Sequence, residues 1–203
     1  MPARARSWYT RIMTLLAVAV AVHLTALWAL PRLIMGRVMS AAAPAPQASN
    51  RVVFPPPTDH VQRRVVMPSP DLLYALCTFD VSTQPMRIRA DPKTPHYWSI
   101  ALYAANSDNF FVINDRQAAG LPVDIILSGP SAYPTPSAKP PPGASLPPSL
   151  PASAQQTGAQ TVHAPSTQGL LLMRVLVTDD ARERDIVEAA RRSLQCEPLM
   201  GAS

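Results

Sequence analysis

The chain has 203 residues, enough for one domain of ordinary size, and a formal net charge of +5. The first 50 residues contain five arginines and no acidic residue, whereas the remaining 13 basic residues balance 13 acidic ones. Because the excess positive charge is confined to this N-terminal segment, the composition argues against a basic nucleic-acid-binding surface, and we expect no nucleic acid partner.

An apolar run of about 20 residues, from Ile12 to Pro31, carries no charge and is long enough to cross a bilayer as a helix. Trp8 and Trp28 lie near its ends, where indole rings favour the membrane interface, and Arg32 and Arg37 follow it. The run predicts a transmembrane anchor over 12–35 that contacts the lipid bilayer.

Three arginines precede the run and two follow it, which favours a cytoplasmic N-terminus over 1–11. We therefore expect a single-pass protein of the bacterial inner membrane with its C-terminal domain in the periplasm. A cleaved signal peptide is the alternative, because Ala41–Ala43 offers small residues for a peptidase. The apolar run is longer than the usual apolar region (h-region) of a signal peptide, and two arginines separate it from that position, so an uncleaved anchor is favoured.

The two cysteines, Cys77 and Cys196, would both lie in an oxidising compartment, where one pair has a single intramolecular connectivity. We predict a disulfide between them; two buried thiols are the alternative. The histidines His60, His96 and His163 are far apart and show no zinc-ligand spacing, so we expect no metal and no cofactor.

Alternating apolar residues predict the strands of a small β domain. Leu72 to Val81 places Cys77 on the inward side, and the two arginines of Met86 to Arg89, Arg87 and Arg89, share the outer face. Further strands are expected at Tyr97 to Ala104, Phe110 to Ile113, Val123 to Leu127 and Gly169 to Val177, the last of them pairing centrally.

A terminal helix should follow Asp179 or Asp180, one of which caps it, with Glu183 in capping-box position. Its apolar stripe packs on the sheet and its charged residues face water, and the helix ends near Cys196. The stripe consists of Ile186, Val187, Ala190 and Leu194, and the water-facing residues are Arg182, Glu183, Arg191 and Arg192.

The fold class expected is therefore α+β: an N-terminal transmembrane helix, a small and mainly antiparallel β domain, and a C-terminal helix. Proline-rich composition over 130–168 predicts a disordered insertion, because this segment has too few apolar residues to offset its ordering entropy. The remaining boundaries are a stalk at 36–69, the two parts of the β domain at 70–129 and 169–197, and a tail at 198–203.

The order PDLLYALCTFDVSTQPMRI, HYWSIALYAANSDNFFVINDR, VDIILSGP and GLLLMRVLVTDD resembles the bacterial family catalogued as domain of unknown function 1254, in particular its short, membrane-anchored members. The family pattern has a strand ending in a D-L/V-S-x-x-P turn, here Asp80 to Pro85, an aromatic strand with Tyr97 and Trp98, and an arginine after the next strand, here Arg116. The resemblance implies an envelope location and no established activity. Longer members carry a second unit, so a separate partner is expected to supply it.

Seven residues of the aromatic hairpin are candidates for a ligand or partner surface: His96, Tyr97, Tyr103, Asp108, Asn114, Asp115 and Arg116. A hydrolase-like enzyme would need several of them to converge. We find no recognised catalytic motif, and turn, cap and surface ion-pair roles account for most of these residue types, so no catalytic residue is assigned.

A non-catalytic module that binds another envelope protein through an open sheet edge or an aromatic face is the favoured interpretation. In the first alternative, the aromatic face and the pair Arg87 and Arg89 bind a small anionic or glycan ligand. A hydrolase is the second.

Overall fold

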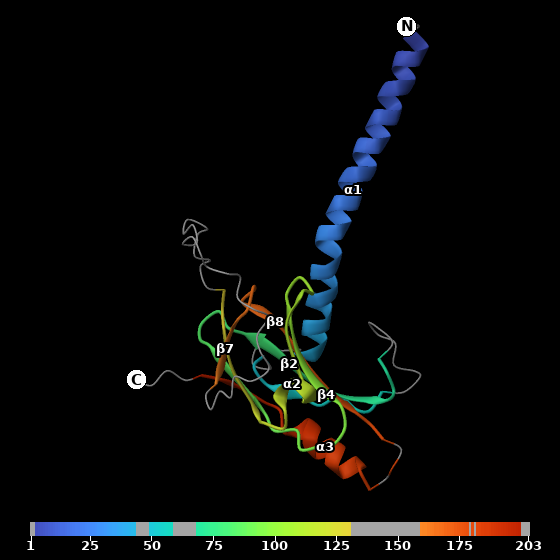
Figure 1. Cartoon of the computed structure of the whole chain (residues 1–203). Helices are drawn as coiled ribbons and strands as arrows, with labels where there is room; N and C mark the ends of the chain where they lie inside the picture. The colour runs from blue at the N-terminus through green and yellow to red at the C-terminus, as the bar shows by residue number, and fades with distance from the viewer. Residues whose placement is uncertain are drawn as a thin grey trace, which may run out of the picture.

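The computed structural model describes residues 3–43, 49–58, 68–130, 159–178, 180 and 182–199. The long helix α1 (Ala3–Ala42) extends away from a domain that contains, within these residues, nine strands and two shorter helices, α2 (Asp115–Ala118) and α3 (Arg184–Arg192) (Figure 1). This architecture confirms the predicted α+β class.

The strands form two sheets rather than one. The five-stranded sheet has the order β1 (Val52–Val53), β2 (Leu72–Asp80), β8 (Gln168–Leu176), β4 (Trp98–Ala104) and β5 (Asn109–Asn114). The four-stranded sheet has the order β7 (Gln160–His163), β6 (Val123–Ser128), β3 (Met86–Ala90) and β9 (Gln195–Pro198). All pairs are antiparallel except β6 with β7, which agrees with the expected mainly antiparallel domain.

The two sheets share one apolar core, to which alternate residues of each strand contribute. In β2, the predicted inward residues Ala75, Cys77 and Phe79 are buried. They face core residues of the other sheet such as Met86 and Ile88, both fully buried.

Strand β8 lies between β2 and β4, as predicted for the most continuously apolar run in the domain. Its Gly169 is required by close packing: a Cβ there would lie 2.2 Å from the Tyr103 carbonyl oxygen and 2.4 Å from the Phe79 ring. Any larger residue would separate β8 from its neighbours.

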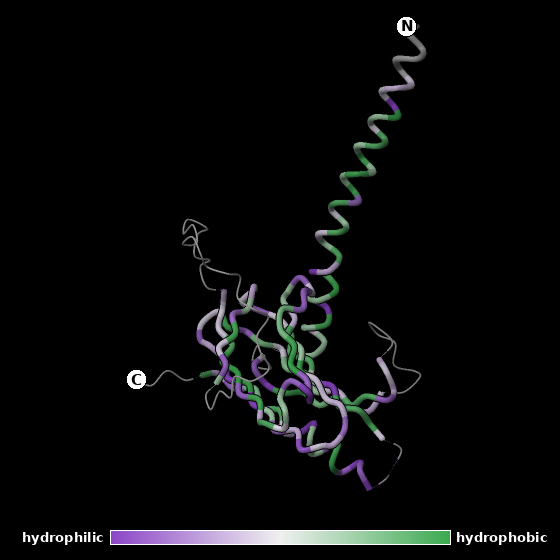
Figure 2. The backbone as a smooth tube through the Cα atoms, viewed as in Figure 1, coloured by the Kyte–Doolittle hydropathy of each residue, from purple (hydrophilic) through white to green (hydrophobic). Residues whose placement is uncertain are grey.

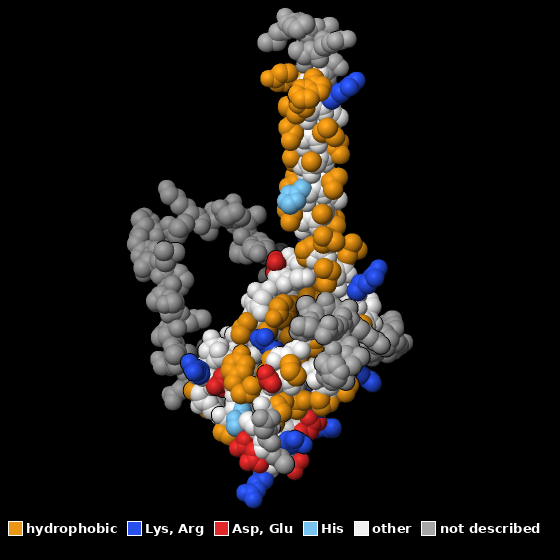
Figure 3. Space-filling model, turned by 90° about the vertical axis from the view of Figure 1, so that its right-hand side faces the viewer, with side chains coloured by type: hydrophobic (Ala, Val, Ile, Leu, Met, Phe, Trp, Pro, Cys, Tyr) orange, Lys and Arg blue, Asp and Glu red, His pale blue; other side chains and the backbone are white. Residues whose placement is uncertain are grey.

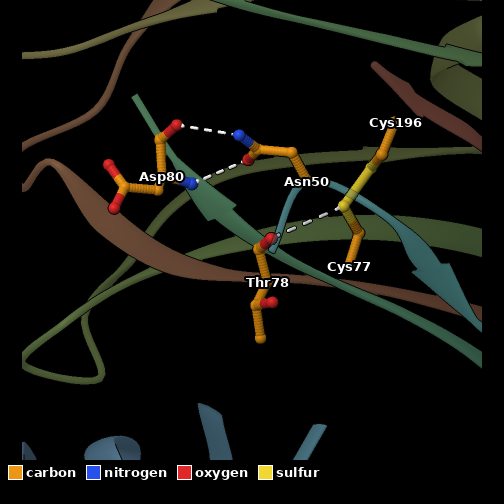
Figure 4. The surroundings of a disulfide bond; sticks show 5 residues. All are labelled: Asn50, Cys77, Thr78, Asp80 and Cys196. Atoms are coloured by element: carbon orange, nitrogen blue, oxygen red, sulfur yellow. Dashed lines mark hydrogen bonds between the residues drawn. A yellow bond between two sulfur atoms is a disulfide. The ribbon is translucent and has the colours of Figure 1, made fainter. Parts of the chain in front are cut away.

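The predicted disulfide is present between Cys77 and Cys196, which are 119 residues apart (Figure 4). Cys77 belongs to β2 and Cys196 to β9, so the bond joins the two sheets through the core. The prediction that Cys196 ends the terminal helix is wrong, because helix α3 stops at Arg192 and residues 195–198 form an additional strand that pairs with β3.

Residues expected to form a stalk over 36–69 instead belong in part to the helix and the domain. Helix α1 continues to Ala42, and Met35 is buried against the domain. Asn50 exchanges two hydrogen bonds with Asp80 across the sheet edge, and Val52–Val53 pairs with β2 (Figure 4). Residues 44–48 and 59–67 of the expected stalk lie outside the described residues.

Helix α3 begins later than the capping pattern predicts. Its N-cap is Glu183, which makes no side-chain capping hydrogen bond, and Asp180 accepts a hydrogen bond from the Arg182 backbone instead. Val187, Ala190 and Leu194 are buried as expected, but Ile186 is exposed.

Arg191 was expected to face water and is 5% exposed. Its guanidinium binds the carbonyl oxygens of Pro55 and Tyr74 and the carboxylate of Glu188, and it lies over the Phe54 ring. Phe54 and Pro55 come from the segment after β1 and Tyr74 from β2, which explains why helical periodicity alone did not predict the burial.

The disordered insertion expected at 130–168 falls mainly on 131–158, outside the described residues. Within its predicted bounds, Gln160–His163 forms β7, and Ala164 is buried. The Val81 backbone donates a hydrogen bond to the Thr167 carbonyl, so the end of this segment is bound to the turn after β2.

Candidate binding face of the five-stranded sheet

The seven predicted surface residues fall into two groups at opposite ends of β4 and β5. Tyr103 and Asp108 lie beside the β4–β5 turn, whereas Tyr97 lies at the other end of β4, about 20 Å away for six residues of extended chain. Among the described residues, the seven therefore do not form one cluster: Tyr103 and Asp108 lie at the turn, and the other five lie at the opposite end of the hairpin.

Turn geometry accounts for the polar residues between β4 and β5. The Ala104 backbone donates to the Asp108 carbonyl, Asn106 donates to the Asp108 carboxylate, and Ser107 has a φ of 73°. These contacts close the turn from within.

Asn114 forms a reciprocal capping box with Gln117 at the start of α2. Its Oδ1 accepts a hydrogen bond from the Gln117 backbone at 3.0 Å, and Gln117 Oε1 accepts one from the Asn114 backbone at 3.1 Å. Arg116 is exposed on the same short helix, and Asp115 Oδ1 is buried without a hydrogen-bond partner.

His96 contacts Glu183 rather than Asp115. Its Nε2 lies 2.9 Å from Glu183 Oε2, which also accepts a hydrogen bond from the Thr178 hydroxyl at 2.9 Å. The three residues come from the chain before β4, the start of α3 and the chain after β8, so their contacts hold these segments together at one end of the domain.

Arg87 and Arg89 lie on the outer face of the four-stranded sheet, as predicted, but they are not available as a free cationic pair. Arg87 binds Asp124 through two hydrogen bonds, Nε to Oδ1 at 2.8 Å and Nη2 to Oδ2 at 2.6 Å, and Arg89 lies 3.8 Å from the same carboxylate. Hydrogen bonding by Arg87 lowers the pKa of Asp124 below its ordinary value.

The outer face of the five-stranded sheet, directed away from the core, differs from this charged surface. Its central feature is a polar row of residues opposite one another across four strands: Tyr74, Arg174, Ser99 and Asn114. Apolar rows flank it on both sides: Leu76, Leu172, Ala101 and Val112 on one, and Leu72, Leu176 and Tyr97 on the other. A single polar row, in which Arg174 is the only charged residue, thus crosses an otherwise apolar surface.

Within the polar row, Tyr74 and Asn114 have hydrogen-bond partners: the Tyr74 hydroxyl accepts from the Ser69 backbone, and Asn114 caps α2. Arg174 Nε and Ser99 Oγ are buried and have no hydrogen-bond partner, and Arg174 forms no ion pair with any described residue. A buried donor without a partner costs roughly 1–3 kcal/mol, so this pair lowers the stability of the ligand-free domain.

Helix α1 covers part of the same face. Its C-terminal turns contact β2 and β8, and the Ser107 hydroxyl donates to the Pro31 carbonyl at 3.0 Å. Arg32 turns back along the helix, donating to the Trp28 carbonyl and lying over its ring. The β4–β5 turn therefore lies at the residue where the uncharged run of α1 ends.

Strand β5 forms an open edge of the five-stranded sheet. Its sequence NFFVIN contains no charge, and no strand in the described part of the chain pairs with its free side. Phe110 is skipped in the pairing with β4, which makes a bulge and leaves Phe111 to Asn114 as the regular part of the edge. Val112 is 42% exposed there.

The fold and this face define a class of protein: a two-sheet α+β domain that follows a long apolar helix, with an uncharged edge strand, β5, on its five-stranded sheet. The family described as "Protein of unknown function (DUF1254)" matches residues 49–198, and the chain belongs to this family. The match begins at the residues before β1, in agreement with the structural finding that they form part of the domain.

Two solved structures resemble the chain. The VPA0106 protein from Vibrio parahaemolyticus has a TM-score of 0.58 at 10% identity over 86% of this chain, and an uncharacterized protein from Burkholderia cenocepacia has a TM-score of 0.43 at 14% identity over 79%. The chain spans 37% of the length of each. None of the curated proteins compared matches the chain. The first likeness supports the fold alone.

Sequence reasoning did not single out Arg174. It is the only charged residue in the run Gly169 to Val177, and it lies in the middle of the predicted central strand. A charge at that position was the available indication, because a central strand that is buried on one face must direct it to the other face.

Proposed function

We propose that this chain is a single-pass protein of the bacterial inner membrane whose periplasmic β domain is a non-catalytic interaction module for another envelope protein. The observation that carries the proposal is the open edge of β5, which is uncharged and pairs only with β4 among the described strands. Natural sheet edges are usually protected by charges, proline or a covering element. Phe111 to Asn114 contains no charge and no proline, and no strand among the described residues covers its free side.

Two features support the membrane and compartment assignment. The segment Trp8–Ala42 is long and apolar enough to cross a membrane, and none of its most apolar window is buried in the domain (Figures 2 and 3). The disulfide between Cys77 and Cys196 is typical of an oxidising compartment. Charged side chains gather at the end of the domain away from α1, where they would be far from the bilayer (Figure 3).

The partner for β5 is a strand of a different chain rather than a second copy of this one. Two β5 strands paired antiparallel about a two-fold axis would place their β4–β5 turns at opposite ends of the joint sheet. Each turn contacts α1 through Ser107 and Pro31, so the two anchors would lie on opposite sides. One bilayer cannot hold both, and a partner strand added by β-augmentation avoids this conflict.

The test is site-specific photocrosslinking in native membranes with a benzophenone amino acid at Val112 of the full-length protein. Val53, 38% exposed on the opposite edge of the same sheet, is the matched control, and Ile126 on the other sheet is a second one. We expect one discrete adduct from Val112 and none from Val53 or Ile126. Absence of any adduct from Val112, or equal adducts from all three positions, would contradict the proposal.

A further inference from the structure

We infer that Arg174 and Ser99 form a binding subsite for a carboxylate group on the outer face of the five-stranded sheet. The inference goes beyond the proposed function, because it concerns the face of the sheet and not its edge. It depends on three observations: the placement of the two residues, their lack of hydrogen-bond partners, and the Arg87–Asp124 pair, an arginine–carboxylate contact that is already formed in this domain.

Placement comes from the strand register. Arg174 of β8 and Ser99 of β4 are directly opposite each other, which brings their Cβ atoms within about 5 Å. Ser99 is 0% exposed, and the rows on both sides of it are apolar apart from the Tyr97 hydroxyl. A ligand group that reaches this row leaves water and meets two donors, the guanidinium and the hydroxyl.

Their lack of partners indicates that a group is missing. Arg174 Nε and Ser99 Oγ are buried atoms without hydrogen bonds, although native domains satisfy most such atoms. Arg191 provides the comparison: its Nε is also without a partner, but its two Nη atoms bind Pro55, Tyr74 and Glu188. Arg174 has no such compensation among the described residues.

The filled example identifies the chemistry. In the other sheet, Arg87 presents Nε and Nη2 to the two oxygens of Asp124, at 2.8 and 2.6 Å. A guanidinium edge matches a planar carboxylate in this way, and Arg174 has the same edge unoccupied. Ser99 adds a hydroxyl donor beside it. A carboxylate satisfies both orphan atoms with two oxygens.

The carboxylate can come from a small molecule or from an acidic side chain of a protein partner. Asp115 directly follows Asn114, the last residue of the polar row, and its Oδ1 is buried without a hydrogen-bond partner. Its charge disfavours a second anionic group on the α2 side, so the ligand should carry its carboxylate at one end only.

The experiment uses the full-length protein in nanodiscs, labelled with 15N-arginine, and follows the Arg174 Nε–H resonance, assigned by its loss in Arg174→Lys. The probes are acetate, an N-acetylated and amidated Ala-Glu-Ala tripeptide, its Ala-Gln-Ala analogue, and chloride at matched ionic strength. We expect a saturable shift with acetate or with the Glu tripeptide and none with chloride or the Gln tripeptide. The Arg87 resonance is the internal control, because its carboxylate contact is already made.

Ser99→Ala keeps the fold and the arginine while removing one donor, and we expect the affinity for the responding carboxylate to fall about threefold to tenfold. A response to both probes indicates a site open to small carboxylates, and a response to the Glu tripeptide alone indicates a protein source. A shift that chloride or the Gln tripeptide reproduces, or no saturable shift at all, would overturn the inference. Neither result affects the crosslinking test at Val112, so the two proposals can fail separately.

Discussion

The outer faces of the two sheets carry the same residue type in different states. On the four-stranded sheet, Arg87 is paired with Asp124 through two hydrogen bonds at the surface. On the five-stranded sheet, Arg174 lies between apolar rows and has no partner, beside an equally unpartnered Ser99. The comparison indicates that the first face is complete as a water-facing surface, whereas the second lacks a binding group.

The same contrast holds for the surroundings of each face. The long apolar helix α1 contacts strands of the five-stranded sheet, which also contains the uncharged edge β5 and the exposed apolar residues Val53 and Val112. The four-stranded sheet contributes the disulfide partner Cys196 and the buried side chains of β3 and β6 to the core. The four-stranded sheet therefore has a charged outer face, whereas the five-stranded sheet has an apolar outer face and an uncharged edge.

The largest effect is expected from breaking the covalent link between the two sheets. Replacing Cys77 and Cys196 together by alanine should lower the free energy of unfolding by about 3–5 kcal/mol, because the bond closes a loop of 119 residues. Denaturant unfolding of the full chain measures this loss. Reductant should reproduce it in the wild type and leave the double variant unchanged; equal stability of the wild type with and without reductant would refute the prediction.

The strands near the disulfide were predictable from sequence because alternation and length are local properties. The alternating residues of β2 and the apolar run of β8 each identify a strand, and the two cysteines allow only one pairing. By contrast, β9 has four residues, one of them proline, and β1 has two, so neither contains enough residues to show a period. Their pairing depends on β3 and β2, which are far away in the sequence.

The candidate site was harder to predict for the same reason. His96 and Asp115 were both candidates on the hairpin, but the partner of His96 is Glu183, 87 residues away. Arg87 and Arg89 were correctly assigned to one face, yet Asp124, which binds Arg87 and lies 3.8 Å from Arg89, comes from β6. A sequence pattern shows which face a residue occupies, whereas the residue opposite it is known only once the strands are paired.

A smaller effect is expected in the pH dependence of stability, which depends on Asp124 on the outer face of the four-stranded sheet. Hydrogen bonding by Arg87 lowers the pKa of Asp124 below its ordinary value of 3.8, so the folded state binds this proton less tightly than the unfolded chain. The resulting stabilisation is present above about pH 4 and is lost as the pH falls through the folded-state pKa.

Asp124→Asn should therefore be less stable than the wild type at pH 7 and approach it as the pH falls below about 4. Asp80, whose pKa is lowered by hydrogen bonds from Ser82 and Gln168, titrates in both proteins and cancels in the difference. Urea unfolding at several pH values provides the measurement, and a stability difference independent of pH would mean that the Arg87–Asp124 contact contributes no net stabilisation.

The smallest expected effect is a change in the free energy of unfolding when an arginine is replaced by methionine. This change should have opposite signs on the outer faces of the two sheets, so it tests the comparison between them most directly. Arg174→Met keeps an unbranched apolar stem, matches the apolar rows beside it and removes an unpartnered buried donor. We expect the free energy of unfolding to rise by about 0.5 kcal/mol, or the melting temperature by about 2 °C, because the replaced group costs stability in the free domain. Arg87→Met should instead lower the melting temperature, since it leaves Asp124 without its bidentate partner.

Binding sites commonly sacrifice stability for function. A gain in stability in Arg174→Met together with loss of the carboxylate response would therefore identify Arg174 as a residue retained for binding. Destabilisation by Arg174→Met equal to that by Arg87→Met would show that both arginines serve the fold and that the two faces are equivalent.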